Sequence, residues 1–220
     1  MIVFDIGAGD GNRAAGWIRT FKDCIVYAFE PDPRQFARLQ ETRSKLKLDE
    51  QRRLKIFNSA VWNKTGKMDF YVCNDITSSS LFPFVPENIK AWKYPPGRHF
   101  FKTIDIIEVE CVTIDSVVKQ EHIEIIDFIR IDAQGAAKQV LQGINGKMFH
   151  RIKEIFVKCN VAELEIYRGQ TYKEDVDRIL LKQYFIITDH QSYSRNQEMW
   201  VRYVSDIWKK SMSGKIYGLS

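Results

Sequence analysis

The chain opens with a short apolar segment, MIVFDI, that leads directly into three evenly spaced glycines. The glycines are Gly7, Gly9 and Gly11, and Asp5 stands just before them. Residues 11–21 then show the apolar spacing of a helix. This order predicts the first strand–turn–helix unit of an α/β fold. A ligand is expected beside the turn, because glycine lets the backbone approach it without a Cβ in the way.

Apolar strands and helices continue to alternate along the chain, which predicts a doubly wound α/β fold with a mainly parallel sheet. A turn at 63–66 predicts a hairpin between two of the strands, and the last two strands predict an antiparallel hairpin at one sheet edge. The predicted strands are 24–30, 54–62, 67–73, 106–115, 124–132, 152–160, 184–190 and 198–204, and the helices are 33–47, 116–120, 135–148 and 171–183.

The stretch around 74–104 interrupts this alternation with three consecutive serines, four prolines and a cluster of aromatic residues. We interpret it as an inserted lid. Its aromatic side chains, among them Trp92, Tyr94 and Phe100, either stack on a sugar ring or form a small satellite core under the loop.

The 220 residues suit a single domain with a sizeable core. The net charge of +5 is spread along the chain, which favours a solvated surface over a nucleic-acid patch. No apolar run is long enough to predict a membrane span. The four cysteines are far apart in sequence and are expected to be buried free thiols, as in a reducing, cytoplasmic compartment.

Glu30 ends the second predicted strand, 19 residues after Gly11. An acid at this place can accept hydrogen bonds from both ribose hydroxyls of a nucleotide. A dinucleotide would require G-x-G-x-x-G, whereas this chain has G-x-G-x-G preceded by an acid. S-adenosylmethionine suits this turn better, because backbone N–H groups can bind its carboxylate and Asp5 or nearby carbonyls its ammonium.

The loop after the third strand of such folds lies along the adenine, where a polar side chain can bond the base edge. The predicted cofactor-binding residues are Asp5, Gly7, Ala8, Gly9, Gly11, Asn12, Glu30, Pro31, Asn58, Ser59, Ala60 and Asp132.

With these segments in view, the chain resembles the class I S-adenosylmethionine-dependent methyltransferases, and more narrowly the FkbM family. The most specific part of the resemblance is IDFIRIDAQGAAKQVLQGI at 126–144. The other matching segments are 4–12, 28–33, 58–72, 78–81 and 112–118. The resemblance implies methyl transfer to oxygen, often to a hydroxyl of a sugar or polyketide.

The chain departs from the family pattern at several positions. Arg130 stands where lysine is usual, Gln134 and Ala137 replace acids, and Lys158 lies in a strand end that often carries an acid. Family members also carry some tens of residues before the first glycine turn, whereas four residues precede Asp5 here. We therefore expect residues 1–220 to be one methyltransferase domain that is either minimal or, as we favour, excised from a longer polypeptide.

Asp132 is the first candidate for the base that activates the acceptor hydroxyl, or for a group that orients it. The alternative is that Asp132 pairs with Arg130 and only shapes the cofactor site, because alternate residues of a strand share a face. His99, in the predicted lid, is the second catalytic candidate. A divalent cation, Mg²⁺ or Mn²⁺, is a further hypothesis with Asp132 as a ligand, although the neutral Gln134 weakens such a site.

The predicted function is therefore S-adenosylmethionine-dependent O-methylation of a saccharide or glycoconjugate, with no nucleic acid as partner. One alternative is an RNA-directed ribose 2′-O methyltransferase, suggested by the basic charge, although no clear Lys-Asp-Lys-Glu set is recognised in the sequence. Another is a module that binds the methyl donor without catalysis, suggested by Gln134 and Lys158.

Overall fold

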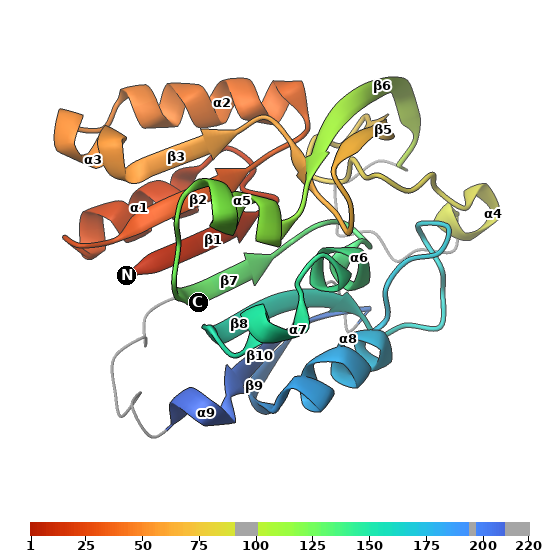
Figure 1. Ribbon diagram of the computed structural model, residues 1–220. Helices are drawn as coiled ribbons and strands as arrows, with labels where there is room; N and C mark the ends of the chain where they lie inside the picture. The colour runs from red at the N-terminus through yellow and green to blue at the C-terminus, as the bar shows by residue number, and fades with distance from the viewer. Residues whose placement is uncertain (91–100, 194–196, 210–220) are drawn as a thin grey trace.

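The computed structural model describes residues 1–90, 101–193 and 197–209 and is built around a seven-stranded sheet (Figure 1). The strand order is β3-β2-β1-β7-β8-β10-β9. All neighbouring pairs are parallel except those of β10, which is antiparallel to both β8 and β9. The predicted doubly wound, mainly parallel sheet and its antiparallel edge hairpin are confirmed. The strands are β1 Ile2–Ile6, β2 Ile25–Phe29, β3 Leu54–Phe57, β7 Ile126–Ile131, β8 Ile152–Asn160, β9 Phe185–Tyr193 and β10 Glu198–Ser205.

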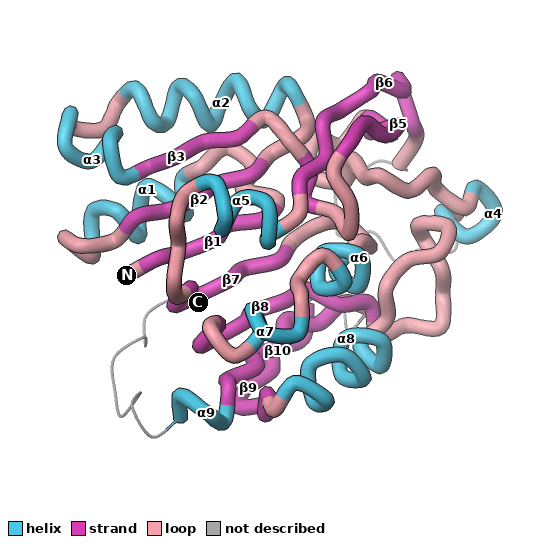
Figure 2. The backbone as a smooth tube through the Cα atoms, in the orientation of Figure 1, coloured by secondary structure: helices cyan, strands magenta, loops and turns pink. Residues whose placement is uncertain are grey.

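Helices cover the sheet from both sides (Figure 2), because successive strand residues point to opposite faces. In β1, Val3 packs with one hydrophobic cluster and Phe4 with the other. The cluster of Val3 includes α1 and α2, and the cluster of Phe4 includes α5, α6, α7 and α8. The helices are α1 Asn12–Thr20, α2 Pro33–Ser44, α3 Leu48–Arg53, α4 Pro86–Ile89, α5 Ile114–Gln120, α6 Ala137–Gln142, α7 Gly146–Phe149, α8 Lys173–Leu180 and α9 Asp206–Lys209, with a 3-10 turn at Leu181–Gln183.

A second, three-stranded sheet corrects the predicted hairpin at 63–66. The predicted strand 54–62 divides into β3 of the large sheet and β4 (Ala60–Val61) of the small one. β4 does not pair with β5 (Gly66–Cys73); instead β6 (Thr103–Val112) lies between them, parallel to β4 and antiparallel to β5. The turn residues predict pairing between strands that are adjacent in sequence. The strand that separates β4 from β5 begins about thirty residues after β5, so the turn residues carry no information about it.

The predicted helix 135–148 is likewise two helices, α6 and α7. Gly143 ends α6 where the backbone passes close to the loop that follows β4: a Cβ on Gly143 would lie 2.4 Å from the carbonyl oxygen of Trp62. Asn145 then caps α7 by accepting a hydrogen bond from the Met148 amide at 3.0 Å.

The segment predicted as a lid is partly a packed wall of the molecule. Ser78, Ser79 and Ser80 are buried, and Ser80 forms an antiparallel bridge with Tyr71 of β5. Phe84 stacks on Tyr167 with ring centroids 5.1 Å apart. The lid interpretation of Trp92, Tyr94 and Phe100 falls on residues outside the described part of the chain.

The expectation of free, buried cysteines is also met. All four cysteines are free and buried. Among the described residues, no helix has the length and apolar character needed to cross a membrane.

Candidate functional site

A cavity of about 600 Å³ lies at the carboxyl ends of β1, β2, β7 and β8. Within the sheet, β2 and β3 lie on one side of β1, and β7 and β8 lie on its other side. The direction in which successive strands are added therefore changes next to β1. Ligands of doubly wound sheets bind at such a switch point, and the volume suits a small molecule. Nine of the predicted cofactor residues line the cavity: Gly7, Ala8, Gly9, Asn12, Glu30, Pro31, Ser59, Ala60 and Asp132.

The glycine turn is folded tightly against its neighbours. The amides of Gly7 and Ala8 both donate to the carbonyl of Phe29 at 3.0 Å, which ties the turn to the end of β2. Gly7 has a φ of +75°, and a Cβ there would lie 2.2 Å from the carbonyl oxygen of Asp132. The turn can thus adopt this path only with glycine at position 7.

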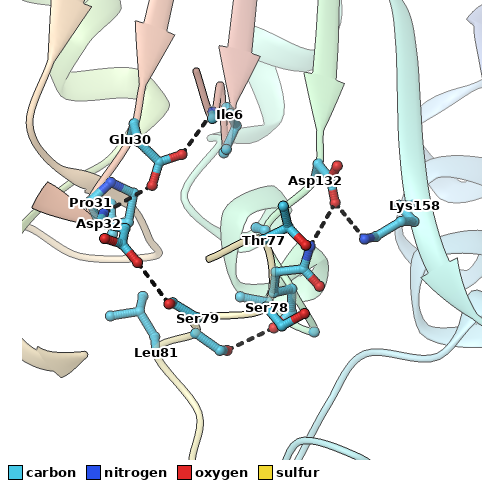
Figure 3. A pocket seen from close by; sticks show the side chains of 18 of the residues that line it. Ile6, Glu30, Pro31, Asp32, Thr77, Ser78, Ser79, Leu81, Asp132 and Lys158 are labelled. Carbon is cyan, nitrogen blue, oxygen red and sulfur yellow. Dashed lines mark hydrogen bonds and ion pairs between the residues drawn. The ribbon is translucent and has the colours of Figure 1, made fainter. Parts of the chain in front are cut away.

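Glu30 is fixed at the wall of the cavity by two backbone amides (Figure 3). Its Oε2 accepts from Gly9 N at 2.8 Å, and its Oε1 accepts from Asp32 N at 2.9 Å. Burial raises the pKa of Glu30 to about 7, although the two amides oppose this shift. The carboxylate therefore has a defined position beside the glycine turn, where each oxygen keeps lone pairs for a ligand hydroxyl.

Two polar side chains on the β2–β3 side of the cavity have buried atoms without a hydrogen-bond partner among the described residues. They are Oγ of Ser59 and Oε1 of Gln35, and both residues line the cavity. Buried polar atoms are normally paired, so these two are suited to a bound ligand. Asn58, also predicted to contact an adenine, does not line the cavity, and Gln35 was not recognised in the sequence.

The serine-rich segment closes this side of the cavity through Asp32. Asp32 begins α2, accepts from the amide of Arg34 at 3.0 Å and pairs with its guanidinium at 2.6 Å. The Ser79 hydroxyl donates to Asp32 at 2.7 Å. Burial would raise the pKa of Asp32, but these hydrogen bonds hold it below its usual value.

A chain of charged side chains forms the opposite wall, and it includes the predicted catalytic residue. Asp5 pairs with Arg130 at 3.0 Å, and Arg130 pairs with Asp132 at 2.7 Å. Asp132 also pairs with Lys158 at 2.7 Å, as Figure 3 shows, and Lys158 lies 3.5 Å from Glu198. Asp5 and Gly11, which were predicted to bind the cofactor, do not line the cavity. Asp5 is fully buried, and Gly11 is the N-cap of α1 and packs against Leu39.

The environment of Asp132 bears on its predicted role as a base. Burial would raise the pKa of Asp132, but Lys158 and Arg130 hold it below its usual value. A carboxylate with a lowered pKa accepts a proton less readily, which disfavours the role of base, and the pair with Arg130 is the contact that the alternative interpretation expects. His99 lies outside the described residues.

The metal hypothesis gains no support from this geometry. Both oxygens of Asp132 face a cation of the protein itself. Within residues 1–90, 101–193 and 197–209, no group of three or more histidine, cysteine or acidic side chains is arranged to hold a metal ion.

Three further polar residues complete this wall; the sequence singled out Gln134 only as a departure from the family pattern, and it did not single out Tyr167 or Glu198. Gln134 has a φ of +41° and donates to Asp132 at 3.2 Å. The Tyr167 hydroxyl donates to the carbonyl of Ser78 at 3.0 Å and so links the wall to the serine-rich segment. Glu198 is brought in by β10. Its only signal in the sequence is its position at the first residue of the last predicted strand.

The fold is that of the class I S-adenosylmethionine-dependent methyltransferases. M. capricolum TrmK in complex with S-adenosylhomocysteine superimposes with a TM-score of 0.52 at 10% identity, over 94% of this chain and 62% of that one. Magnesium protoporphyrin IX methyltransferase (ChlM) from Synechocystis PCC 6803 with bound SAM gives 0.50 at 11% identity, over 93% and 69%.

Within this class, the chain belongs to the FkbM methyltransferase family, because the model of the Methyltransferase FkbM domain matches residues 5–187. The chain is also 27% identical over 170 residues to 2-O-methyltransferase NoeI of Sinorhizobium fredii (strain NBRC 101917 / NGR234). That match covers 77% of this chain and 66% of the relative, so the chain spans just under two thirds of the relative's length.

Proposed function

We propose that this protein transfers a methyl group from S-adenosylmethionine to a hydroxyl of a sugar or glycoconjugate. The observation that carries the donor assignment is Glu30, held by two backbone amides at the cavity wall beside the glycine turn. Its carboxylate suits the ribose hydroxyls. The unpartnered atoms of Ser59 and Gln35 suit the polar edge of the base, and the absence of a Cβ at Gly7 leaves the turn free to approach the ligand.

S-adenosylmethionine, when bound, supplies an electrophilic methyl group, so the protein mainly has to align the acceptor and exclude water. The acceptor side of the cavity is lined by hydroxyl, amide and aromatic groups, including Tyr167, Gln170, Thr171 and Asn160. Such groups suit a neutral polyhydroxyl ligand, with hydrogen bonds to its hydroxyls and an aromatic face against its ring. The similarity to NoeI, a 2-O-methyltransferase, supports oxygen as the atom that receives the methyl group.

We assign Asp132 the task of orienting the acceptor hydroxyl. Its carboxylate is fixed by Arg130 and Lys158 and lies at the end of β7, where it lines the cavity. Asp132→Asn should then lower turnover while leaving the affinity for S-adenosylhomocysteine within about threefold of the wild type.

The experiment that tests the proposal has two stages. Isothermal titration with S-adenosylhomocysteine measures donor-site binding, and labelled S-adenosylmethionine is then offered with a panel of methyl glycosides, including 6-deoxyhexosides. Label transferred to a glycoside hydroxyl, located by NMR, supports the proposal. Absence of S-adenosylhomocysteine binding contradicts it, and tight binding without turnover on the whole panel favours the non-catalytic binding module.

One observation favours a second candidate, ribose 2′-O methylation of RNA. Asp132, Lys158 and Glu198 lie together in the structure, and they correspond in type to three of the four residues of a Lys-Asp-Lys-Glu set. Lys158 is the one lysine among the described residues that line the cavity. Adding capped RNA to the panel separates the two candidates: transfer to RNA alone would contradict the sugar assignment.

A further inference from the structure

The wall opposite Glu30 is built like a site for a cation, with two carboxylates from different strands converging at one place. Asp132 follows β7 and Glu198 begins β10, and these two strands flank β8 on either side. The atom between the two carboxylates is Nζ of Lys158, 2.7 Å from Oδ1 of Asp132 and 3.5 Å from Oε1 of Glu198. All three residues line the cavity.

We propose that the ammonium group of Lys158 takes the place of a divalent cation on the acceptor side of the cavity. Carboxylates that converge at one place are the oxygen ligands that Mg²⁺ and Mn²⁺ prefer. Here a compact, strongly hydrated point charge on a flexible stem occupies the same position. The use of this site in catalysis rests on the proposed function, but the occupancy of the carboxylates by Lys158 does not.

The surroundings of Lys158 allow its ammonium group to act in place of a divalent cation. Its side chain is 10% exposed, and those of Asp132 and Glu198 are each 19% exposed, so the charges are only partly screened by water. Arg130 takes the other oxygen of Asp132 at 2.7 Å. Removing the charge of Lys158 would leave two carboxylates with Arg130 as their one charged partner among the pairs described, and this excess of negative charge should attract a divalent ion.

The position also defines what Lys158 does for an acceptor. A hydroxyl held against Asp132 lies beside a fixed positive charge, which stabilises the negative charge that develops on the hydroxyl oxygen. As the bond between the methyl group and the donor sulfur breaks and the bond from the hydroxyl oxygen to the methyl group forms, S-adenosylhomocysteine leaves as a neutral thioether and the hydroxyl proton passes to solvent. Methyl transfer should therefore proceed without added metal. In this respect Lys158 is a positioning and electrostatic residue of the acceptor site.

Manganese binding tests the proposal without an acceptor. Mn²⁺ binding to the full chain is measured by titration calorimetry and by electron paramagnetic resonance, for the wild type and for Lys158→Met, Lys158→Arg and Lys153→Met. Lys153 is the matched control, because it lies on the same strand but outside the cavity. Its ammonium group pairs with Asp127 at 2.6 Å. Lys158→Met should bind Mn²⁺ at least tenfold more tightly than the wild type, and the two other variants should not differ from it.

The double variant Lys158→Met with Glu198→Gln should lose the gained affinity, which locates the ion. Unchanged affinity for S-adenosylhomocysteine shows that each variant is folded. The proposal is overturned if the wild type binds Mn²⁺ as tightly as Lys158→Met, or if Lys158→Met gains no affinity. In the glycoside assay, chelator should not alter wild-type transfer, and Lys158→Met should lower it at least 100-fold. If no glycoside of the panel is methylated, the result counts against the proposed function alone, because manganese binding is measured without an acceptor.

Discussion

Glu30 and Asp132 are both carboxylates at the ends of central parallel strands, yet their environments shift their pKa values in opposite directions. Among the described residues, the hydrogen-bond partners of Glu30 are backbone amides, so burial dominates and raises its pKa to about 7. Asp132 has two cationic partners, which hold its pKa below the usual value despite burial. A neutral carboxyl group and an ionised one can thus coexist near neutral pH in one cavity.

Removing the carboxyl group of Glu30 should weaken donor binding. We expect Glu30→Ala to cost roughly 1–3 kcal/mol in affinity for S-adenosylhomocysteine, or about 5- to 150-fold in Kd, because hydrogen bonds to a charged group are lost. Titration calorimetry measures the change. Glu41→Ala, on the exposed face of α2, is the control and should leave Kd unchanged. Equal affinities of the wild type and Glu30→Ala would refute the ribose assignment.

The raised pKa of Glu30 also predicts a pH dependence of donor binding. Ligand hydroxyls donate to the ionised carboxylate, so affinity should rise as pH increases from 6 to 8, with release of a proton. In the ligand-free protein the sign for stability is opposite. The folded pKa lies above the usual 4.5, so the contribution of Glu30 to stability is complete below that value and is lost as pH rises through about 7. Calorimetry in buffers of different ionisation enthalpy measures the proton release, which Glu30→Gln should abolish.

At the scale of elements, the turn after β1 and the turn after β7 hold each other in place. The amide of Asp132 donates to the carbonyl of Ile6 at 2.8 Å, and Gly7 packs directly on the backbone of Asp132. The donor-binding turn and the acceptor-orienting carboxylate are therefore parts of one rigid junction between neighbouring strands. A change in one turn should therefore alter both the donor-binding turn and the position of the Asp132 carboxylate.

Alanine substitutions at two glycines, one in this junction and one inside a helix, should change the stability of the protein in opposite directions. Gly7→Ala should destabilise the protein by about 2–4 kcal/mol, because position 7 has a φ of +75° and its new Cβ would meet the carbonyl oxygen of Asp132. Gly16→Ala, inside α1, meets nothing within 4 Å and should stabilise by about 0.5–1 kcal/mol. Urea unfolding measures both. If Gly7→Ala were as stable as the wild type, the tight packing of the junction would be wrong.

At the scale of the whole molecule, the cavity is formed by segments from most of the chain length. Residues from the glycine turn, α2, the serine-rich segment, β7, β8, α8's preceding loop and β10 all line it. A ligand that contacts so many segments is bound by the folded state and not by the unfolded chain. Its binding free energy therefore adds to the global stability.

This coupling predicts a thermal shift. S-adenosylhomocysteine at about 100 times its Kd should stabilise the protein by about 2.7 kcal/mol and raise Tm by about 5–10 °C. Differential scanning fluorimetry measures the shift, and Glu30→Ala at the same ligand concentration should show a smaller one. A Tm that does not respond to the ligand would exclude the cavity as the donor site.

The features that the sequence by itself determined are those encoded over a few neighbouring residues. Apolar periodicity located the strands of the large sheet, and the turn from Asp5 to Gly11 with Glu30 located the predicted donor site, because these signals depend only on local spacing and backbone freedom. Even so, local signals did not distinguish one strand from two at 54–62, or one helix from two at 135–148.

The tertiary structure alone decided which distant residues meet. Lys158 and Glu198 are forty residues apart in the chain and become neighbours because β10 pairs with β8. Ser79 reaches Asp32, and β6 separates β4 from β5, for the same kind of reason. These contacts depend on strand order and on the packing of one sheet against another, which follow from the total burial and hydrogen bonding of the folded chain. No short segment contains that information, and for this reason the residues around Lys158 emerged only from the fold.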